Sequence, residues 1–132
     1  MRFQVAVAPS TIDGKGAFSQ MHIPAKRKVG ELIGEIISLR KGRKIAKTKK
    51  RIALVELDYK YALLAADNNN PLRYVNHSCS PNTYMRIFKH HVEFYTLRPI
   101  KKSEELTANY GETHHEGKLK CRCNAPNCVG KI

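Results

Sequence analysis

Three cysteines in the sequence are spaced like ligands of a metal ion. Cys121, Cys123 and Cys128 lie within eight residues of one another. In a chain without a recognisable secretory signal, such clustering favours metal binding over disulfide bonds. A structural zinc ion takes four ligands in a tetrahedron, so these three thiolates need one more. Reduced cysteines without a metal are the alternative interpretation.

Two other stretches and one turn carry residues suited to binding or catalysis. The stretch Leu72–Asn82 contains an Arg and the run Asn76-His77-Ser78-Cys79, and the stretch Glu105–Gly111 ends in Tyr-Gly. The turn Gly14-Lys15-Gly16 lets backbone approach a ligand closely, although most such turns are only hairpins. No Gly-x-Gly-x-x-Gly follows a predicted strand, which argues against a Rossmann-type nucleotide site.

In order and spacing, these stretches resemble the SET-domain protein lysine methyltransferases that have a cysteine-rich post-SET tail. The resemblance runs from about residue 3 to residue 129. It implies a mostly-β fold of small curved sheets. In that fold the segment near Tyr110 passes beneath a loop made by the Asn-His stretch, forming a pseudoknot. It divides the chain into a SET domain, 1–112, and a zinc-binding tail, 113–132.

The resemblance also implies two ligand sites. The first binds S-adenosylmethionine through the backbone at Lys15, Gly16 and Ala17 and through Arg73, Asn76, His77 and Tyr110. The second is a zinc site, in which Cys79 joins Cys121, Cys123 and Cys128, so that all four cysteines of the chain are used. A core histidine satisfied by backbone is the alternative for His77, and a buried tyrosine with one hydrogen bond is the alternative for Tyr110.

The implied reaction is methyl transfer from S-adenosylmethionine to a lysine amine. The amine must be neutral, although free lysine has a pKa near 10.4. A dry channel and a nearby sulfonium charge both disfavour the ammonium form. Tyr110 would orient the amine, and water could carry the proton away. Leu32, Ala53 and Ala108 stand where many family members have aromatic residues, so the number of methyl groups added stays open.

Short strands must position these residues. Apolar alternation and β-branched residues predict strands within 3–7, 29–38, 52–57, 61–67, 83–88 and 92–97. The segment 105–110 is predicted to be an apolar, buried course. A short helical turn is predicted over 72–75, where it would aim the residues that follow. The segment 40–51 is predicted as a surface insertion that can contain a short helix. Many short strands with few helices predict a mostly-β fold.

The chain is strongly basic, with a net charge of +13 over 132 residues. The basic residues concentrate in the segment 40–51, where a solvated face, a nucleic-acid contact and a nuclear-localisation signal are all open interpretations. Expected protein substrates are histones, histone-like proteins or ribosomal proteins. The alternative is a catalytically weak binding module that acts through its basic face on nucleic acid or a protein partner.

The sequence predicts no contact with a membrane. No apolar run approaches the roughly 18 residues that span a bilayer, and the first residues lack the pattern of a signal peptide. We therefore expect an intracellular protein, in the cytoplasm or nucleoid of a prokaryote or in the nucleus of a eukaryote.

Overall fold

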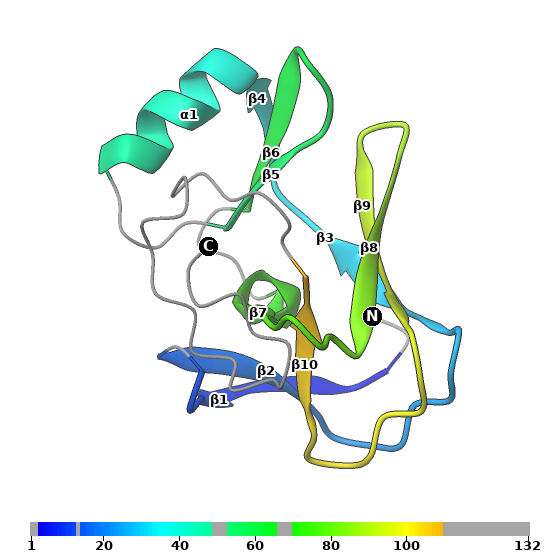
Figure 1. Ribbon diagram of the computed structural model, residues 1–132. Helices are drawn as coiled ribbons and strands as arrows, with labels where there is room; N and C mark the ends of the chain where they lie inside the picture. Colours follow the sequence, from blue (N-terminus) through cyan, green and yellow to red (C-terminus); the bar gives the residue numbers. More distant parts are fainter. Residues whose placement is uncertain (1–2, 13, 49–52, 66–69, 110–132) are drawn as a thin grey trace.

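The computed structural model describes residues 3–12, 14–48, 53–65 and 70–109 (Figure 1). Within them the chain forms two β-sheets, an α-helix and a turn of 3₁₀ helix. The elements are β1 (Val5–Pro9), β2 (Lys15–Ser19), β3 (Lys28–Leu32), β4 (Glu35–Ser38), α1 (Leu39–Thr48), β5 (Ala53–Glu56), β6 (Tyr61–Ala65), η1 (Pro71–Tyr74), β7 (Asn76–His77), β8 (Thr83–Phe88), β9 (His91–Thr96) and β10 (Glu105–Ala108).

The larger sheet has seven strands in the order β1-β2-β10-β8-β9-β3, with β7 paired to β10 beside that path. β10 is antiparallel to β2 and parallel to β7 and β8. The last described strand of the chain therefore lies between a strand from its beginning and two strands from its middle. This placement makes β10 the element that joins distant parts of the sequence (Figure 1).

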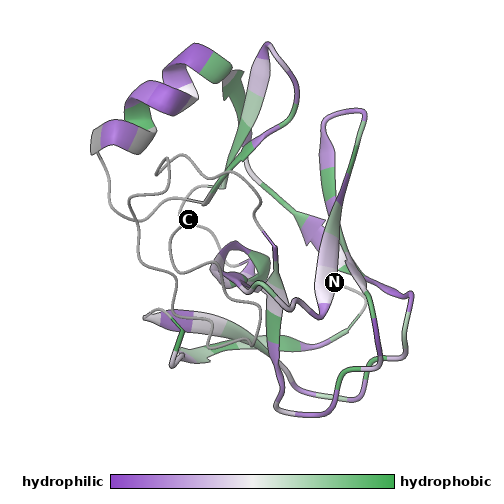
Figure 2. Ribbon diagram, viewed as in Figure 1, coloured by the Kyte–Doolittle hydropathy of each residue, from purple (hydrophilic) through white to green (hydrophobic). Residues whose placement is uncertain are grey.

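The smaller sheet has three strands in the order β4-β6-β5 and carries α1. Gly42 is buried on the inner side of α1, where a Cβ would lie 3.2 Å from Leu54 Cδ1 and 3.4 Å from Ala62 Cβ. The outer side of α1 is hydrophilic (Figure 2). None of the helices in the described ranges is long and apolar enough to cross a bilayer.

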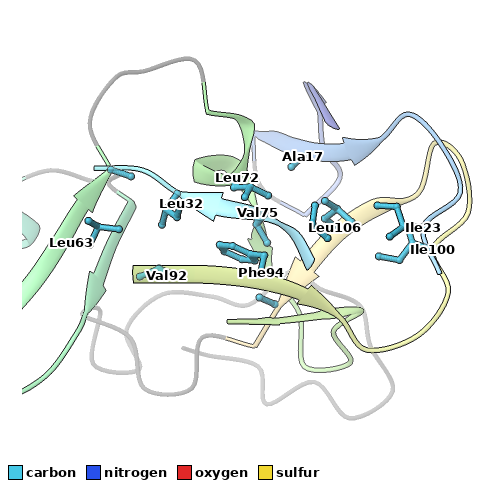
Figure 3. Close-up of a cluster of buried hydrophobic side chains, with 13 residues drawn as sticks. Ala17, Ile23, Leu32, Leu63, Leu72, Val75, Val92, Phe94, Ile100 and Leu106 are labelled. Carbon is cyan, nitrogen blue, oxygen red and sulfur yellow. The ribbon is translucent and has the colours of Figure 1, made fainter. Parts of the chain in front are cut away.

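One cluster of buried apolar side chains connects the two sheets (Figure 3). β9 illustrates how the sequence builds it, because Val92 and Phe94 are buried while Glu93, which lies between them, is more exposed. Burying one such side chain contributes about 1.5–3 kcal/mol. The cluster consists of Ala17, Ile23, Val29, Leu32, Leu63, Ala65, Leu72, Val75, Val92, Phe94, Ile100, Leu106 and Ala108.

The predicted mostly-β fold is confirmed, and the predicted helical turn and surface helix correspond to η1 and α1. The first strand was predicted over 3–7, whereas β1 spans Val5–Pro9, and β2 was predicted only as a turn. The last hairpin strand was predicted to begin at Val92, whereas β9 begins at His91. The turn before it contains only Lys89 and His90, whose φ values are 49° and 64°. Positive φ at both central residues is typical of a two-residue hairpin turn.

The pseudoknot stays a prediction. β7 lies parallel to β10, with Asn76 beside Thr107 and His77 beside Ala108. The Asn-His stretch is thus in contact with the strand that leads toward Tyr110. The course of the chain after Asn109, including the predicted tail 113–132, lies outside the described residues.

Candidate active site

β10 brings the glycine-containing strand and the Asn-His stretch to one place. Its first half pairs with β2, where Leu106 lies beside Ala17. Its second half pairs with β7, where Thr107 lies beside Asn76. The three stretches that the sequence singled out therefore share one strand ladder. Ladder hydrogen bonds fix their relative positions, because a slip of one residue would turn every buried side chain outward.

The Asn76 side chain links β7 to the β1–β2 turn and to β10. Its Nδ2 donates to the backbone oxygen of Lys15 at 3.1 Å, to Glu105 Oε2 at 3.0 Å and to Ser10 Oγ at 3.3 Å. Only the amide nitrogen can donate to a carbonyl and a carboxylate, so these partners define the orientation of the amide. The structure thus brings together two predicted cofactor-binding residues, Lys15 and Asn76.

The glycines of the Gly14-Lys15-Gly16 stretch have different roles. Gly14 lies in the turn with φ of 43°, and its oxygen accepts a hydrogen bond from the Ser10 N–H at 2.8 Å. Gly16 already belongs to β2, where a Cβ would lie 2.3 Å from Glu105 Oε2. The sequence interpretation that both glycines shape one tight loop is therefore corrected: Gly14 allows the turn, and Gly16 makes room for a carboxylate.

Ala17 lies deeper than its neighbours in the sequence. Its side chain is fully buried, and its backbone lies between Val7 of β1 and Leu106 of β10. It anchors β2 to the core. A contribution of its backbone to cofactor binding stays a prediction.

The 3₁₀ turn η1 positions Arg73. Asn70 caps the turn by accepting from the Leu72 N–H at 2.9 Å and ties it to β3 by donating to the Glu31 oxygen at 2.7 Å. The Arg73 Nη1 donates to Tyr74 Oη at 2.6 Å, and the guanidinium carbon lies 4.7 Å from the Tyr74 ring centroid. Arg73 thus lies along Tyr74, and its predicted contact with a cofactor stays untested.

His77 and Cys79 form a buried pair two residues apart. The His77 Nε2 lies 3.4 Å from Cys79 Sγ, and both residues are less than a tenth exposed. Burial lowers the pKa of His77 below its ordinary value because the imidazolium loses its hydration. A neutral imidazole is therefore the favoured form near pH 7. The predicted contact of His77 with S-adenosylmethionine stays a prediction.

The predicted zinc site is described only at Cys79. Its thiol is buried, as expected of a structural ligand. Cys121, Cys123 and Cys128 lie outside the described residues. Within the residues that the structure describes, no group of three or more potential metal ligands occurs. Cys79 fits the donor chemistry of zinc, and the complete ligand set stays a prediction.

The predicted lysine channel is described in part. Leu32 and Ala108, two of the positions without an aromatic residue, belong to the buried apolar cluster. On the hairpin of β8 and β9, Tyr84 and Tyr95 stack on each other with ring centroids 5.6 Å apart. Tyr110 and the Ala53 side chain lie outside the described residues.

The sequence did not predict that Glu105, Ser10 and Asn82 hold the site together, although Asn82 and Glu105 lie at the ends of the two stretches described above. Asn82 Oδ1 accepts from the Thr107 N–H at 2.8 Å, and its Nδ2 donates to the Glu105 oxygen at 2.7 Å. Ser10 Oγ donates to the Glu105 carboxylate at 2.9 Å. Polar residues in a turn next to a glycine are the only sequence signal for this cluster, and that signal is weak.

Comparisons with known proteins agree with this arrangement. The SET domain family matches residues 14–111. The histone-lysine N-methyltransferase, H3 lysine-4 specific, of Schizosaccharomyces pombe is 34% identical over 138 residues, covering 98% of this chain and 15% of that protein. The protein of the same name from Saccharomyces cerevisiae is 32% identical, covering 96% of this chain and 13% of its own length.

A third relative has a different name. The histone-lysine N-methyltransferase Su(var)3-9 of Drosophila pseudoobscura pseudoobscura is 31% identical over 147 residues, covering 89% of this chain and 23% of that protein. The chain thus spans less than a quarter of the length of each of these three relatives. The family match covers most of the chain and includes β2, β7 and β10, which carry the polar cluster. The chain belongs to the SET domain family.

Proposed function

We propose that this protein is a protein-lysine N-methyltransferase that uses S-adenosylmethionine. The observation that carries the proposal is the ladder in which β10 joins β2 to β7 and places Asn76 against the Lys15 backbone. Membership of the SET domain family supports it. The relatives above, named as histone-lysine N-methyltransferases, support it as well.

The hydrogen-bond acceptors of the cluster fit the cofactor. A backbone oxygen at Lys15, an amide at Asn76 and a carboxylate at Glu105 lie together, and the oxygens of such groups suit the ammonium at the amino-acid end of S-adenosylmethionine. This cofactor supplies the methyl group from its sulfonium. We assign its binding to the predicted set Lys15, Gly16, Ala17, Arg73, Asn76, His77 and Tyr110.

In this proposal the chain's own residues align the reacting groups and exclude water from them. Holding the target amine in a channel with little water favours its neutral form, because burial disfavours the ammonium. Alignment of the amine with the methyl group supplies much of the rate enhancement. The Tyr110 hydroxyl orients the amine by hydrogen bonding, and water carries the proton away. The number of methyl groups that the small residue Ala108 permits is left to measurement.

We propose zinc as a structural metal of the predicted tail, 113–132. Cys79, Cys121, Cys123 and Cys128 would bind it as thiolates and tie the tail to the SET domain, predicted over 1–112. Elemental analysis of the purified chain is expected to find one zinc per chain. Cys79→Ser should lower that content and the melting temperature together. A metal-free wild-type chain that keeps the melting temperature of the purified form would contradict the assignment.

We propose a histone as the protein substrate, because the relatives reported above are named as histone methyltransferases. Histone-like DNA-bound proteins and ribosomal proteins are the other substrates that the sequence allows. A chromatin substrate places the protein inside the cell, in the nucleus of a eukaryote or in the nucleoid of a prokaryote.

The test is mass spectrometry of histones, histone-like proteins and ribosomal proteins after incubation with the purified chain and S-adenosylmethionine. We expect a gain of one or more methyl masses on a histone lysine. Tyr110→Phe should lower the rate by at least about tenfold, a usual scale for losing a positioned catalytic group. Cofactor binding without transfer to any protein of the panel would contradict the proposal, and full activity of the variant would contradict the role of Tyr110.

A second candidate function is contact with nucleic acid through α1. Arg40, Lys44 and Lys47 are exposed, and their spacing of four and three residues places them on one face of the helix. Arg43 is also exposed and pairs with Glu56, with Nη2 and Oε1 3.2 Å apart. A stripe of cations without aromatic residues suits the phosphate backbone rather than the bases. This observation favours nucleic-acid contact over a merely solvated face.

Salt dependence of DNA binding tests this candidate. We expect affinity for a short duplex to fall with salt. Replacing Arg40, Lys44 and Lys47 by Gln should reduce the slope of log K against log salt by about 2.7, because each lost phosphate contact removes about 0.9. Lys101→Gln with Lys102→Gln is the control, since both residues are exposed in a distant turn. Equal slopes for the two variants would contradict a specific role for α1.

A further inference from the structure

Glu105 lies at the centre of the polar cluster, a position that the sequence did not predict. Ser10 Oγ is 2.9 Å from both carboxylate oxygens, and Asn76 Nδ2 is 3.0 Å from Oε2. The two donors come from the β1–β2 turn and from β7. One carboxylate on β10 therefore holds two segments that are distant from it in the sequence.

The charge of Glu105 has no partner of opposite sign within the described residues. Both of its side-chain donors are neutral. By contrast, Glu104 pairs with Arg98 and Glu93 pairs with Lys28, each at 2.6 Å. The chain carries a net charge of +13, so cations are abundant. A partly buried carboxylate without a cationic partner loses hydration, and no ion pair compensates for that loss.

The surrounding backbone is shaped to admit this carboxylate. A Cβ on Gly16 would lie 2.3 Å from Oε2 and 2.9 Å from Cδ of Glu105. Real side-chain atoms do not approach so closely, so any larger residue at position 16 would displace the carboxylate or the strand. The position of the Glu105 carboxylate therefore requires glycine at position 16.

The same contacts set the direction of the Asn76 amide. Because Nδ2 is directed at Glu105 and at the Lys15 oxygen, Oδ1 faces away from the carboxylate. An amide oxygen and a carbonyl oxygen are both acceptors for an ammonium group. The negative charge behind them strengthens their attraction for a cation, since charges act more strongly where water is excluded.

We propose that Glu105 is a positioning residue for the ammonium group of the cofactor. It orients the Asn76 amide, holds the β1–β2 turn through Ser10 and supplies the negative charge that complements the ammonium. This inference rests on the proposed function, because it takes S-adenosylmethionine as the ligand. Glu105 acts through Asn76 and the Lys15 backbone rather than by touching the reacting methyl group.

Two cofactor analogues isolate the ammonium. The first is S-adenosylhomocysteine, and the second is its deaminated form, which lacks only the amino group. Calorimetry should show that the wild-type chain binds the first more tightly. Glu105→Gln should weaken binding of the first by about tenfold, the scale of one lost charge-assisted interaction. It should leave binding of the second within about twofold, so the discrimination between the two analogues shrinks.

Three further variants separate positioning from general loss of structure. Glu105→Asp keeps the charge but shortens the side chain. If the charge dominates, this variant should lower the affinity for S-adenosylhomocysteine less than Glu105→Gln does. If orientation dominates, the two variants should lower it equally, and either result supports the proposal. Ser10→Ala removes one donor and should weaken this analogue by about threefold. Glu93→Gln is the matched control on β9, where the lost carboxylate pairs with Lys28; it should leave both affinities unchanged.

The outcomes separate this inference from the proposed function. A wild-type chain that binds neither analogue nor S-adenosylmethionine would overturn the proposed function and this inference together. A wild-type chain that binds both analogues equally would overturn only the inference, because the ammonium would not be recognised. Glu105→Gln with unchanged affinities, or with equal losses for both analogues, would also overturn it. If Glu105→Gln does not fold, an unchanged affinity of Ser10→Ala for S-adenosylhomocysteine decides against it.

Discussion

The two sheets of this protein are built in different ways. The smaller sheet and its helix come from one continuous part of the sequence, from β4 to β6. The larger sheet joins strands from both ends of the described chain, and the Ser10–Glu105 hydrogen bond spans 95 positions. The polar cluster lies in the larger sheet, whereas the smaller sheet carries an exposed basic helix (Figure 2).

This difference shows how the fold separates two tasks. A site whose residues must keep their relative positions benefits from several strands that fix one another. A helix on a small local sheet can vary in charge and length with little effect on that site. We therefore expect substitutions in the larger sheet to change stability and cofactor binding together, and substitutions in the smaller sheet to change surface contacts mainly.

The largest expected effect is in β10. Leu106 is fully buried in the central strand of the larger sheet, beside Ala17. Leu106→Ala should lower the free energy of unfolding by about 2–5 kcal/mol, because it removes buried apolar surface and leaves a cavity. Urea titration measures this loss. Ile36→Ala in β4, where the side chain is 48% exposed, should cost less than about 1 kcal/mol. Equal losses would remove the distinction between the two sheets.

An intermediate loss of stability is expected from a substitution where the two sheets join. Gly34 lies between β3 and β4, and a Cβ there would be 2.3 Å from the backbone oxygen of Leu64. Backbone cannot move aside easily, so Gly34→Ala should lower the free energy of unfolding by about 1–3 kcal/mol. Hydrogen exchange of this variant should be faster mainly for the backbone amides of β4 and β6.

Gly42→Ala in α1 is the matched control for that substitution. Its Cβ would meet only side-chain atoms, the nearest at 3.2 Å, and alanine has the better helix propensity by about 1 kcal/mol. We expect a stability within about 1 kcal/mol of the wild type. A loss as large as that of Gly34→Ala would mean that the smaller sheet tolerates no change at its helix.

The smallest expected effect is on the pH dependence of stability, through Glu104. Partial burial alone raises the pKa of Glu104, but hydrogen bonds from Arg98, the Lys101 N–H and Asn82 lower it below its ordinary value overall. A lowered folded-state pKa stabilises the fold above the unfolded value, about 4.3, and this contribution is lost as pH falls through the folded value. Glu104→Gln should therefore be less stable than wild type at pH 7, with a difference that shrinks below about pH 4.

Urea titrations of both proteins between pH 7 and pH 3 measure that difference. Glu56→Gln is the counterpart in the smaller sheet, where Glu56 and Arg43 are about half exposed. Exposed ion pairs contribute little, so this variant should stay close to wild type at every pH. A difference for Glu104→Gln that persists unchanged at pH 3 would show that its carboxylate charge is not the cause.

Much of the local structure followed from the sequence. Most strands, the turn η1 and the helix α1 have apolar patterns and turn residues that act over a few positions, and these elements were predicted near their bounds, whereas β2 and β7 were not predicted as strands. The Asn76 stretch and the Gly14 turn were recognised as parts of one site, and the ladder through β10 brings them together.

The role of Glu105 could not be read in the same way. Nothing in the residues around it specifies a partner at Ser10. The sequence also gives no sign that Gly16 makes room for the Glu105 carboxylate, because that role depends on contact between two distant strands. Asn82 was likewise only a turn residue in the sequence, yet it donates to the Glu105 backbone oxygen.

The sequence by itself determined most of the secondary structure, the basic surface and the family of this protein, because each depends on residue type and local spacing. Only the tertiary structure decided which polar groups share a site. That choice depends on strand register, since a carboxylate and an amide become partners only when buried apolar neighbours such as Leu106 and Ala17 have set the strands that carry them.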